Sequence, residues 1–168
     1  MISLLHTIGK LKLVKRAGWK KHNILLGESV ADHSYRVAMM ALLLGKDTQL
    51  NMEQLLKLAL VHDVAESIVG DITPDDAITT DEKMKKEEHA LTQMNDTGLL
   101  ALWKEYEQAQ TPEAKFIKQL DNLEMALQAY EYEEQYELHL QEFFDSSEPK
   151  ITDPALQKIF AEIMVKRA

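Results

Sequence analysis

The chain has 168 residues, of which 45% are hydrophobic and 28% charged, a composition typical of one globular domain with a single core. Its 28 acidic and 19 basic residues leave a net charge of -9, which argues against a partner as extended and anionic as nucleic acid. Because there is no Cys, disulfides, thiolate metal sites and a cysteine nucleophile are excluded, and any metal site must use His and carboxylates.

The N-terminal segment lacks the apolar stretch and small-residue cleavage site of a secretion signal. No apolar run approaches the roughly 18 residues that a membrane span needs. We therefore expect a cytoplasmic protein.

After a first helix, the stretch from Ala17 to Gly27 contains a Gly-Trp pair and two Lys, which predicts a loop.

Two helices are predicted next. Ser29 and Asp32 have capping-box spacing and open an apolar-periodic run that ends at Leu44, before Gly45. Asn51 and Gln54 repeat the spacing ahead of a run from Leu55 to about Ser67, closed by Gly70. The segment from Val69 to Ala77, which includes Pro74 and Asp75, is predicted to be irregular.

Capping signals also open the later helices. Thr79 with Glu82 predicts a helix to about Met94, and Thr111-Pro112 and Asp153-Pro154 each place a capping side chain before a first-turn proline. The helix after Thr111 carries a core stripe formed by Phe116, Leu120, Leu123, Leu127 and Tyr130. No segment shows a convincing two-residue period. The sequence therefore predicts an all-α, compact multi-helix bundle that forms a single domain over residues 1–168.

Two histidines share the apolar faces of these helices. His33 is in helical phase with Val37 and Leu44, and His62 follows Leu55 and Leu58 by seven and four residues. A single His on an apolar face is more often a satisfied core residue than a ligand. Two inward histidines therefore need further evidence before a site is inferred.

Carboxylates beside His62 supply that evidence. Asp63 follows His62 directly, and Glu66 lies one helical turn further on the same face. Buried carboxylates are costly unless they are paired or bind a metal. A divalent cation would satisfy both histidines and these acids together. Asp121, at the border of a core stripe, is a weaker candidate for the opposing ligand, because acids at such borders are usually solvated.

The order of these residues resembles the H…HD…D signature of the HD-domain phosphohydrolases. A closer resemblance, to the HD domain-containing protein 2 group of 5'-deoxynucleotidases and their YfbR-type bacterial relatives, is carried by longer motifs. They are Arg16-Ala-Gly-Trp19, Glu28-Ser-Val-Ala-Asp-His33, His62-Asp-Val-Ala-Glu-Ser-Ile-Val-Gly-Asp-Ile-Thr-Pro74, Ala114-Lys-Phe-Ile-Lys-Gln-Leu-Asp121 and Phe143-Phe-Asp-Ser. The resemblance runs from Leu11 to the C-terminal helix, and the segment from Met94 to Gln110 is its most variable part.

The resemblance implies hydrolysis of a 2'-deoxyribonucleoside 5'-monophosphate to deoxynucleoside and phosphate. It also implies that His33, His62, Asp63 and Asp121 hold the divalent metal on which this reaction depends. It favours Mn²⁺ or Co²⁺, although Mg²⁺, Zn²⁺ and Fe²⁺ also suit the ligands. It further associates Glu66, Asp71 and the Ile72 carbonyl with a second cation, and it suggests a homodimer.

Other roles are expected around this metal. Glu66 is a candidate for orienting or deprotonating the attacking water, a role that overlaps with metal binding, and Asp71 could share that catalytic role or simply form a turn. Arg16 matches the arginine of the family and could bind phosphate oxygens. Trp19 could pack against the substrate, or anchor its loop. Lys118 is interpreted as a surface lysine, and Glu87 and Glu88 as an exposed charged face.

Two alternatives stay open from the sequence. One is another HD phosphohydrolase, which would act on a nucleoside triphosphate, a cyclic nucleotide or an alarmone. The other is a helical binding protein whose core histidines are satisfied and which catalyses nothing.

Overall fold

The structure is a computed structural model that describes residues 1–73 and 76–167; Pro74 and Asp75 of the predicted irregular segment lie outside the described residues. The α-helices are α1 (Ile2–Gly9), α2 (Ala17–Lys21), α3 (Val30–Leu44), α4 (Met52–Val61), α5 (Glu66–Val69), α6 (Thr80–Gln93), α7 (Thr97–Gln108), α8 (Pro112–Tyr136), α9 (Gln141–Ser147) and α10 (Pro154–Arg167). Short 3₁₀ turns cover Lys10–Lys12, Gly45–Asp47 and Glu148–Lys150. The described ranges contain no strand, only one isolated bridge between Lys15 and Ser29, so the all-α prediction is confirmed.

The predicted caps begin the helices as expected. Ser29 accepts from the amide of Asp32 in a complete capping box, and Thr79 forms the same box with Glu82. Thr111 accepts from Ala114 ahead of Pro112. Each cap satisfies amides that have no partner within the helix, so these side chains fix the residues at which α3, α6 and α8 begin.

Two predicted boundaries are wrong. The helix predicted from Leu55 to about Ser67 ends at Val61, because tighter bonds from Val64 to Val61 and from Glu66 to Asp63 interrupt it before α5. The predicted loop from Ala17 to Gly27 contains the short helix α2. The first difference matters for function, since the helix is interrupted at His62 and Asp63, two of the predicted site residues.

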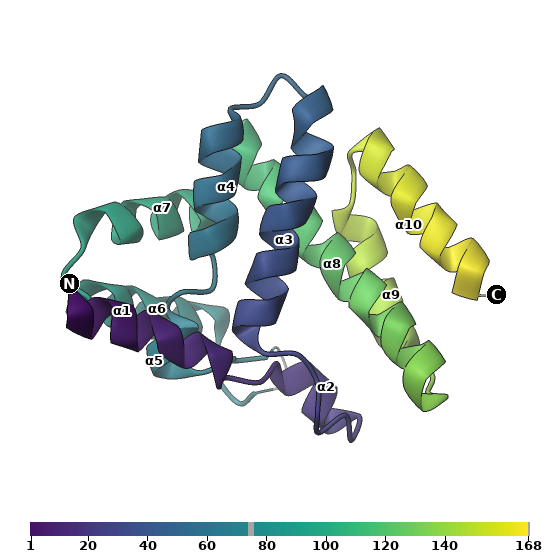
Figure 1. The fold of residues 1–168 in the computed structure, drawn as a ribbon, viewed down its shortest axis with the longest axis horizontal. Coiled ribbons are helices and arrows are strands. Elements are labelled where there is room, and N and C mark those ends of the chain that lie inside the picture. Colours follow the sequence, from purple (N-terminus) through teal and green to yellow (C-terminus); the bar gives the residue numbers. More distant parts are fainter. Residues whose placement is uncertain (74–75, 168) are drawn as a thin grey trace.

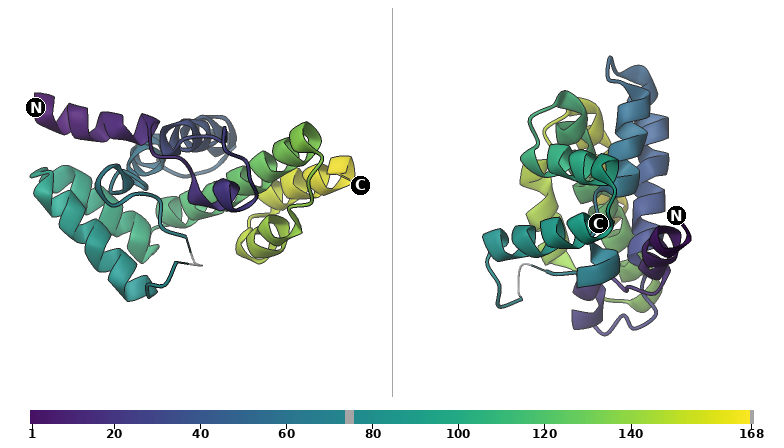
Figure 2. Two further views of the ribbon diagram at one scale, coloured as in Figure 1. Left: turned by 90° about the horizontal axis from the view of Figure 1, so that it is seen from below. Right: turned by 90° about the vertical axis from the view of Figure 1, so that its left-hand side faces the viewer.

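Helices α3, α4 and α8 form the centre of the molecule (Figure 1), and each packs against the other two. Helices α9 and α10 pack along α8 on the side of the C-terminus, while α1, α5, α6 and α7 form the opposite end, next to the N-terminus (Figures 1 and 2). The large core cluster lies around α8, with Leu55, Leu58, Leu120 and Leu123 fully buried. A second cluster, which includes Val61, Val64, Leu91 and Trp103, holds the N-terminal end together.

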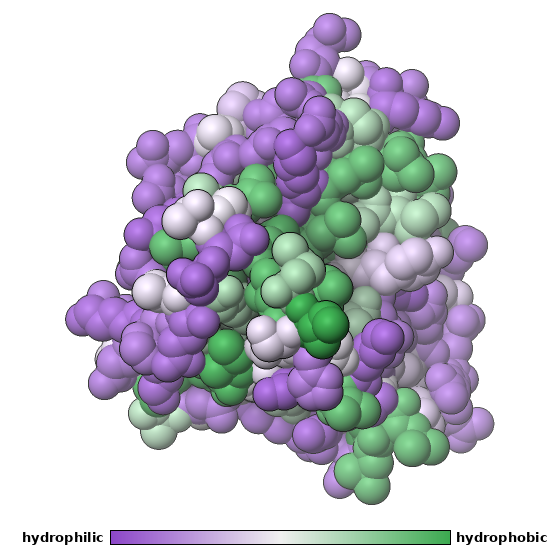
Figure 3. Space-filling view, turned by 60° about the vertical axis from the view of Figure 1, so that its left-hand side comes forward, coloured by the Kyte–Doolittle hydropathy of each residue, from purple (hydrophilic) through white to green (hydrophobic). Residues whose placement is uncertain are grey.

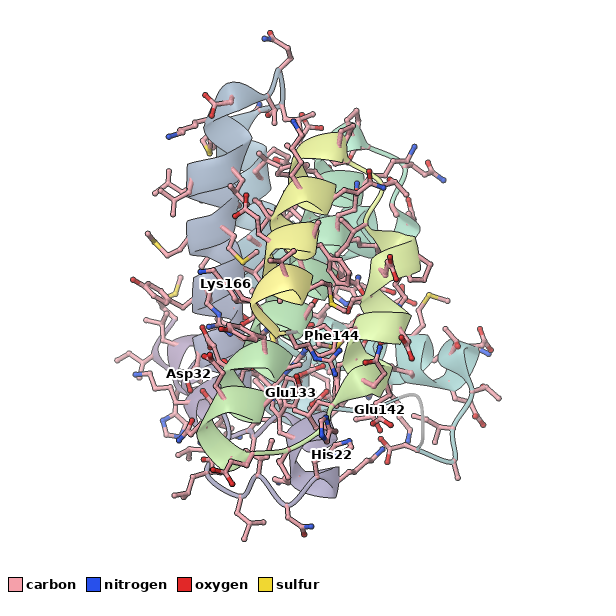
Figure 4. All side chains as sticks on the ribbon, turned by 90° about the vertical axis from the view of Figure 1, so that its right-hand side faces the viewer. His22, Asp32, Glu133, Glu142, Phe144 and Lys166 are labelled. Carbon is pink, nitrogen blue, oxygen red and sulfur yellow. The ribbon has the colours of Figure 1, made fainter. Side chains whose placement is uncertain are left out.

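The C-terminal helices also fasten the α2 region. Figure 4 shows His22 and Glu142 next to each other, and His22 Nε2 lies 2.7 Å from Glu142 Oε1. On the same side, Arg167 lies 4.1 Å above the ring of Phe144 and pairs with Glu133. These contacts connect α2, α9 and α10 to the long helix α8.

Apolar side chains also reach the surface. On the face seen in Figure 3, apolar residues gather in a band between polar edges. Exposed large hydrophobic residues of the described chain include Ile2, Leu5, Leu43 and Leu60. No helix among the described residues combines the length and the hydropathy that crossing a membrane requires.

Gly70 ends α5 in a backbone conformation (φ 79°, ψ 169°) that is essentially restricted to glycine. A Cβ atom there would meet nothing within 4 Å, so only backbone strain opposes a side chain. We expect Gly70→Ala to lower the free energy of unfolding by about 1–3 kcal/mol, measured by denaturant titration. The matched control is Gly9→Ala, also without a neighbour at Cβ but with helical dihedrals, which should leave stability unchanged or raise it. Equal effects of both substitutions would contradict this account.

Candidate metal centre

His33 and His62 face each other at the centre of the bundle. His33 lies on α3 and is 0% exposed, and His62 directly follows α4 and is 3% exposed. Their Nε2 atoms are 3.3 Å apart. Two nitrogen ligands about 2.1 Å from one cation would be separated by roughly 3.0–3.4 Å. The spacing of the two imidazoles therefore fits ligands of a common metal.

The other ring nitrogens have partners that only accept hydrogen bonds. His62 Nδ1 lies 2.8 Å from the carbonyl oxygen of Ala59, and His33 Nδ1 lies 2.6 Å from Glu124 Oε2. Both Nδ1 atoms must therefore donate, and in the neutral rings both Nε2 atoms carry lone pairs that point toward one another. Two lone pairs that face each other at 3.3 Å repel. A positive charge between them, from either a proton or a metal cation, removes this repulsion.

Two carboxylates complete the cluster. Asp63 Oδ2 lies 3.2 Å from His62 Nε2 and 3.7 Å from His33 Nε2, and Asp121 Oδ1 lies 3.2 Å from His33 Nε2. The ligand atoms of His33, His62 and Asp63 all lie within 4.8 Å of one another. Four of the sequence-predicted residues are thus brought together, two with nitrogen and two with oxygen donors, a set that suits a divalent transition metal.

The electrostatics of the cluster also favour a cation. Burial and the charge of Arg16 lower the pKa of His33, but Glu124 and Asp121 outweigh them and raise it to about 10. Burial raises the pKa of Asp63, yet the charges of His62, His33 and Arg16 hold it well below its ordinary value. The pKa of Asp121 is lowered in the same way by His33. Both carboxylates are therefore ionised, and the site attracts positive charge.

A second group of acids lies beside this centre. Glu66, at the start of α5, is 3% exposed, and its Oε2 has no hydrogen-bond partner among the described residues. Burial and the charges of Asp63 and Asp71 raise the pKa of Glu66 well above its ordinary value. Asp71 accepts a hydrogen bond of 2.5 Å from the amide of Ala17. The unpartnered oxygen of Glu66 is the feature here that packing does not explain.

The remaining predicted residues have other contacts. The Ile72 carbonyl accepts from Lys83 Nζ at 3.1 Å, so an ammonium group already binds it. Arg16 lies 3.4 Å from Asp63 Oδ2 and 4.0 Å from Glu28 Oε1, beside the metal cluster. Trp19 is 2% exposed, stacks on Phe143 and donates to Glu28 Oε1. The structure thus favours Trp19 as an anchor of its loop over contact with substrate.

The sequence interpretation missed several groups around the centre. Glu124 is fully buried against His33. Tyr106, which belongs to the variable segment from Met94 to Gln110, donates a hydrogen bond of 2.8 Å to Asp121 Oδ2. Glu87, predicted to be exposed, is 6% exposed and pairs with Lys83, and burial raises its pKa to about 7. Lys118 is only partly exposed and lies 3.9 Å above the Tyr106 ring. Helical phase could have revealed Glu124, three residues after Asp121 on the same helix.

Comparison with known proteins identifies the family of the chain. A family model described as an HD domain matches residues 8–161. The 5'-deoxynucleotidase HDDC2 of Homo sapiens is 44% identical over 100% of this chain and 86% of its own length. The protein of the same name from Danio rerio is 46% identical over 100% of this chain and 88% of its own length.

Solved structures share the fold. A conserved hypothetical protein from Pyrococcus furiosus superposes with a TM-score of 0.85 at 34% identity, covering 98% of this chain and 99% of that one. A structure described as a predicted metal-dependent phosphohydrolase from Magnetospirillum magnetotacticum has a TM-score of 0.76 at 25% identity, covering 99% and 90%. The family match over most of the chain, the curated relatives and the shared fold lead to one conclusion: the chain belongs to the HD-domain family.

Proposed function

We propose that this protein is a metal-dependent 5'-deoxynucleotidase, which hydrolyses 2'-deoxyribonucleoside 5'-monophosphates to deoxynucleoside and phosphate. The observation that carries the proposal is the pair of buried Nε2 atoms 3.3 Å apart, flanked by two ionised carboxylates. Relatives at 41–46% identity named 5'-deoxynucleotidase support the substrate class. The chain is interpreted as a single HD domain over residues 1–168.

The proposed ligands of the cation are His33, His62, Asp63 and Asp121. A divalent cation supplies Lewis-acid chemistry: it polarises the phosphoryl group and lowers the pKa of a bound water toward about 7. The protein contributes a fixed, largely buried set of donors whose outer partners are already in place. Mn²⁺ or Co²⁺ is the proposed metal, and the donor set itself also suits Zn²⁺, Fe²⁺ and Mg²⁺.

Arg16 and Glu66 would act on substrate and water. The guanidinium of Arg16 offers five donors in a planar fork, which matches two phosphate oxygens, and it already lies beside Asp63. Glu66 has an unpartnered, buried oxygen that could accept a proton from the attacking water. The raised pKa of Glu66 makes its carboxylate a stronger base than an exposed one.

A second cation is also proposed, held by Glu66 and Asp71 and, after a movement of Lys83, by the Ile72 carbonyl. The unpartnered Glu66 oxygen supports this reading as well as the general-base reading. The contact between Lys83 and Ile72 weakens the case for the carbonyl, because the ammonium and a metal would compete for it.

A homodimer is proposed from the family resemblance, and exposed apolar side chains such as Leu43 could contribute to its interface. The cytoplasmic location stays a prediction.

The proposed function is tested by phosphate release from a panel of purified nucleotides, run with each of several divalent metals. We expect release from 2'-deoxyribonucleoside 5'-monophosphates and much slower release from the matching ribonucleotides. Release of pyrophosphate or triphosphate from nucleoside triphosphates would identify a different HD phosphohydrolase. A lack of turnover with every nucleotide and metal would favour a non-catalytic binding protein.

Arg16→Ala should mainly weaken substrate binding. Loss of the guanidinium removes charge-assisted hydrogen bonds to phosphate, so we expect KM to rise about 10–100-fold, as loss of roughly 1.5–3 kcal/mol implies. Steady-state kinetics on a deoxynucleoside monophosphate measures this. Lys20→Ala, at an exposed cation of the neighbouring α2, is the control and should leave KM unchanged. An unaltered KM in Arg16→Ala would exclude the phosphate-binding role.

A further inference from the structure

A buried carboxylate outside the proposed ligand set lies directly behind the metal centre. Glu124, on α8, is 0% exposed. Its Oε2 lies 2.6 Å from His33 Nδ1, and its Oε1 accepts a hydrogen bond of 2.7 Å from Arg36 Nε. Each oxygen therefore has one partner, and the two partners are three residues apart on α3.

Arg36 holds this carboxylate in a fixed orientation. Besides its bond to Glu124, it donates to Gln128 Oε1 at 2.6 Å and to Glu131 Oε2 at 2.7 Å. The three acceptors come from successive turns of one face of α8. A planar guanidinium bound at three points cannot rotate without losing hydrogen bonds, so the Oε2 atom of Glu124 is presented to His33 in one position.

An ionised carboxylate only accepts hydrogen bonds, so His33 Nδ1 must carry a proton and donate it. The lone pair of the neutral ring is then at Nε2, the atom that faces His62 and Asp121. For His62 the Ala59 carbonyl has the same effect. The two histidines differ in the origin of this partner. The partner of His62 is a backbone carbonyl, whereas the partner of His33 is a side chain, which a single substitution can change.

We propose that Glu124, clamped by Arg36, is a positioning residue that fixes the tautomer and ring orientation of His33 so that Nε2 is available to a metal cation. This inference rests on the proposed function, since it presupposes the metal centre. Partners of this kind outside the ligand set typically change metal affinity 10–100-fold when they are removed.

Glu124 could instead be a metal ligand itself, because Glu28, His33 and Glu124 also form a group with ligand atoms within 4.8 Å. The distances oppose this reading. Two ligands of one cation are roughly 3 Å or more apart, whereas Glu124 Oε2 and His33 Nδ1 are separated by 2.6 Å, the distance of a charge-assisted hydrogen bond.

Glu124→Gln tests the proposal because it changes the group that His33 meets. Arg36 requires an acceptor, so the amide oxygen should stay with Arg36 and the NH₂ group should face His33 Nδ1. The ring would then be driven to the other tautomer, with the proton at Nε2. Glu133→Gln is the matched control: it makes the same change on α8, at a partly buried Glu whose partners are Arg167 and the amide of Leu140 rather than residues of the metal centre.

The first measurement is Co²⁺ affinity of the wild type and both variants by titration, with thermal unfolding of the metal-free proteins as the check on folding. We expect Glu124→Gln to bind Co²⁺ about 10–100-fold more weakly, and Glu133→Gln to bind it as the wild type does. Equal affinities in the two variants would overturn the positioning role. A wild type that binds no Co²⁺ would overturn the proposed function together with it.

The second measurement begins with the wild type, so it applies even if Glu124→Gln fails to fold. In wild-type protein with ¹⁵N-labelled histidines, loaded with Zn²⁺, NMR should show His33 protonated at Nδ1 and bound to the metal through Nε2. In a folded Glu124→Gln the metal-free spectrum should show the proton of His33 at Nε2. Metal bound through Nδ1 of His33 in the wild type would contradict the inference while leaving the hydrolase intact.

Discussion

His62→Ala should abolish hydrolysis, with kcat reduced at least about 10³-fold, and should remove most of the bound metal. His62 provides one of two nitrogen donors, and its Nε2 faces His33 Nε2 and Asp63 in a buried site. Loss of a donor from a four-residue set removes both affinity and the transition-state stabilisation that a metal supplies. Phosphate release from a deoxynucleoside monophosphate and metal content after gel filtration measure the two effects.

His89→Ala is the control for this substitution, because His89 is exposed on α6 and contacts Gln93 rather than the centre. It should retain wild-type kcat and metal content. If His62→Ala kept both its metal and its activity while folding normally, His62 would be a satisfied core histidine and the proposed ligand set would be wrong.

Glu66→Gln should lower kcat at least about 100-fold, in the range that general acid–base catalysis contributes, and yet should stabilise the metal-free protein. The amide has nearly the same shape but can neither accept a proton nor bind a cation as a carboxylate does. Its stabilising effect follows from burial, since the carboxylate oxygen Oε2 has no partner among the described residues. Activity and denaturant unfolding at pH 7, both on purified variants, measure the two effects.

The sign of the stability effect follows from the raised pKa of Glu66. A carboxyl whose pKa rises on folding binds more protons in the folded state, so stability falls as pH rises from the unfolded pKa toward the folded one. In the metal-free wild type this loss should be seen above about pH 4.3, the ordinary value for Glu, and Glu66→Gln should lack it. The exposed Glu162→Gln serves as the control. An active and less stable Glu66→Gln would contradict both roles assigned to Glu66.

Much of the fold can be predicted from local sequence patterns, above all the residues at which helices begin. Ser29, Thr79 and Thr111 begin helices where the capping pattern predicts, because each cap depends on residues within one turn. The break after Val61 was not predictable in this way. The apolar and polar period continues through His62 to Ser67, so the period does not signal the tighter turn. The contacts that accompany this turn are tertiary, since Asp63 lies beside Arg16 and His33.

In the candidate site, too, local patterns predict some residues, while others depend on contacts between helices. The inward phase of His33 and His62 follows from helical periodicity, and Asp63 and Glu66 follow from adjacency to His62. Asp121 came mainly from the family resemblance, and the structure places its Oδ1 3.2 Å from His33 Nε2. Helical phase with Asp121 places Glu124 on the inward side of its helix, but its pairing with His33 depends on α3 crossing α8. The bond from Tyr106 to Asp121 depends in the same way on α7 crossing α8, and no local pattern in a single sequence specifies either crossing.

The central claim is that hydrolysis depends on a divalent cation held by the four residues around His33 and His62. The most direct measurement follows phosphate release from a 2'-deoxyribonucleoside 5'-monophosphate by chelator-treated protein, while Mn²⁺ or Co²⁺ is added and bound metal per chain is counted. The account predicts no release before metal is added, and activity that returns in proportion to bound metal in the wild type but not in His62→Ala. Full activity of the metal-free protein, or metal binding that His62→Ala leaves unchanged, would contradict it.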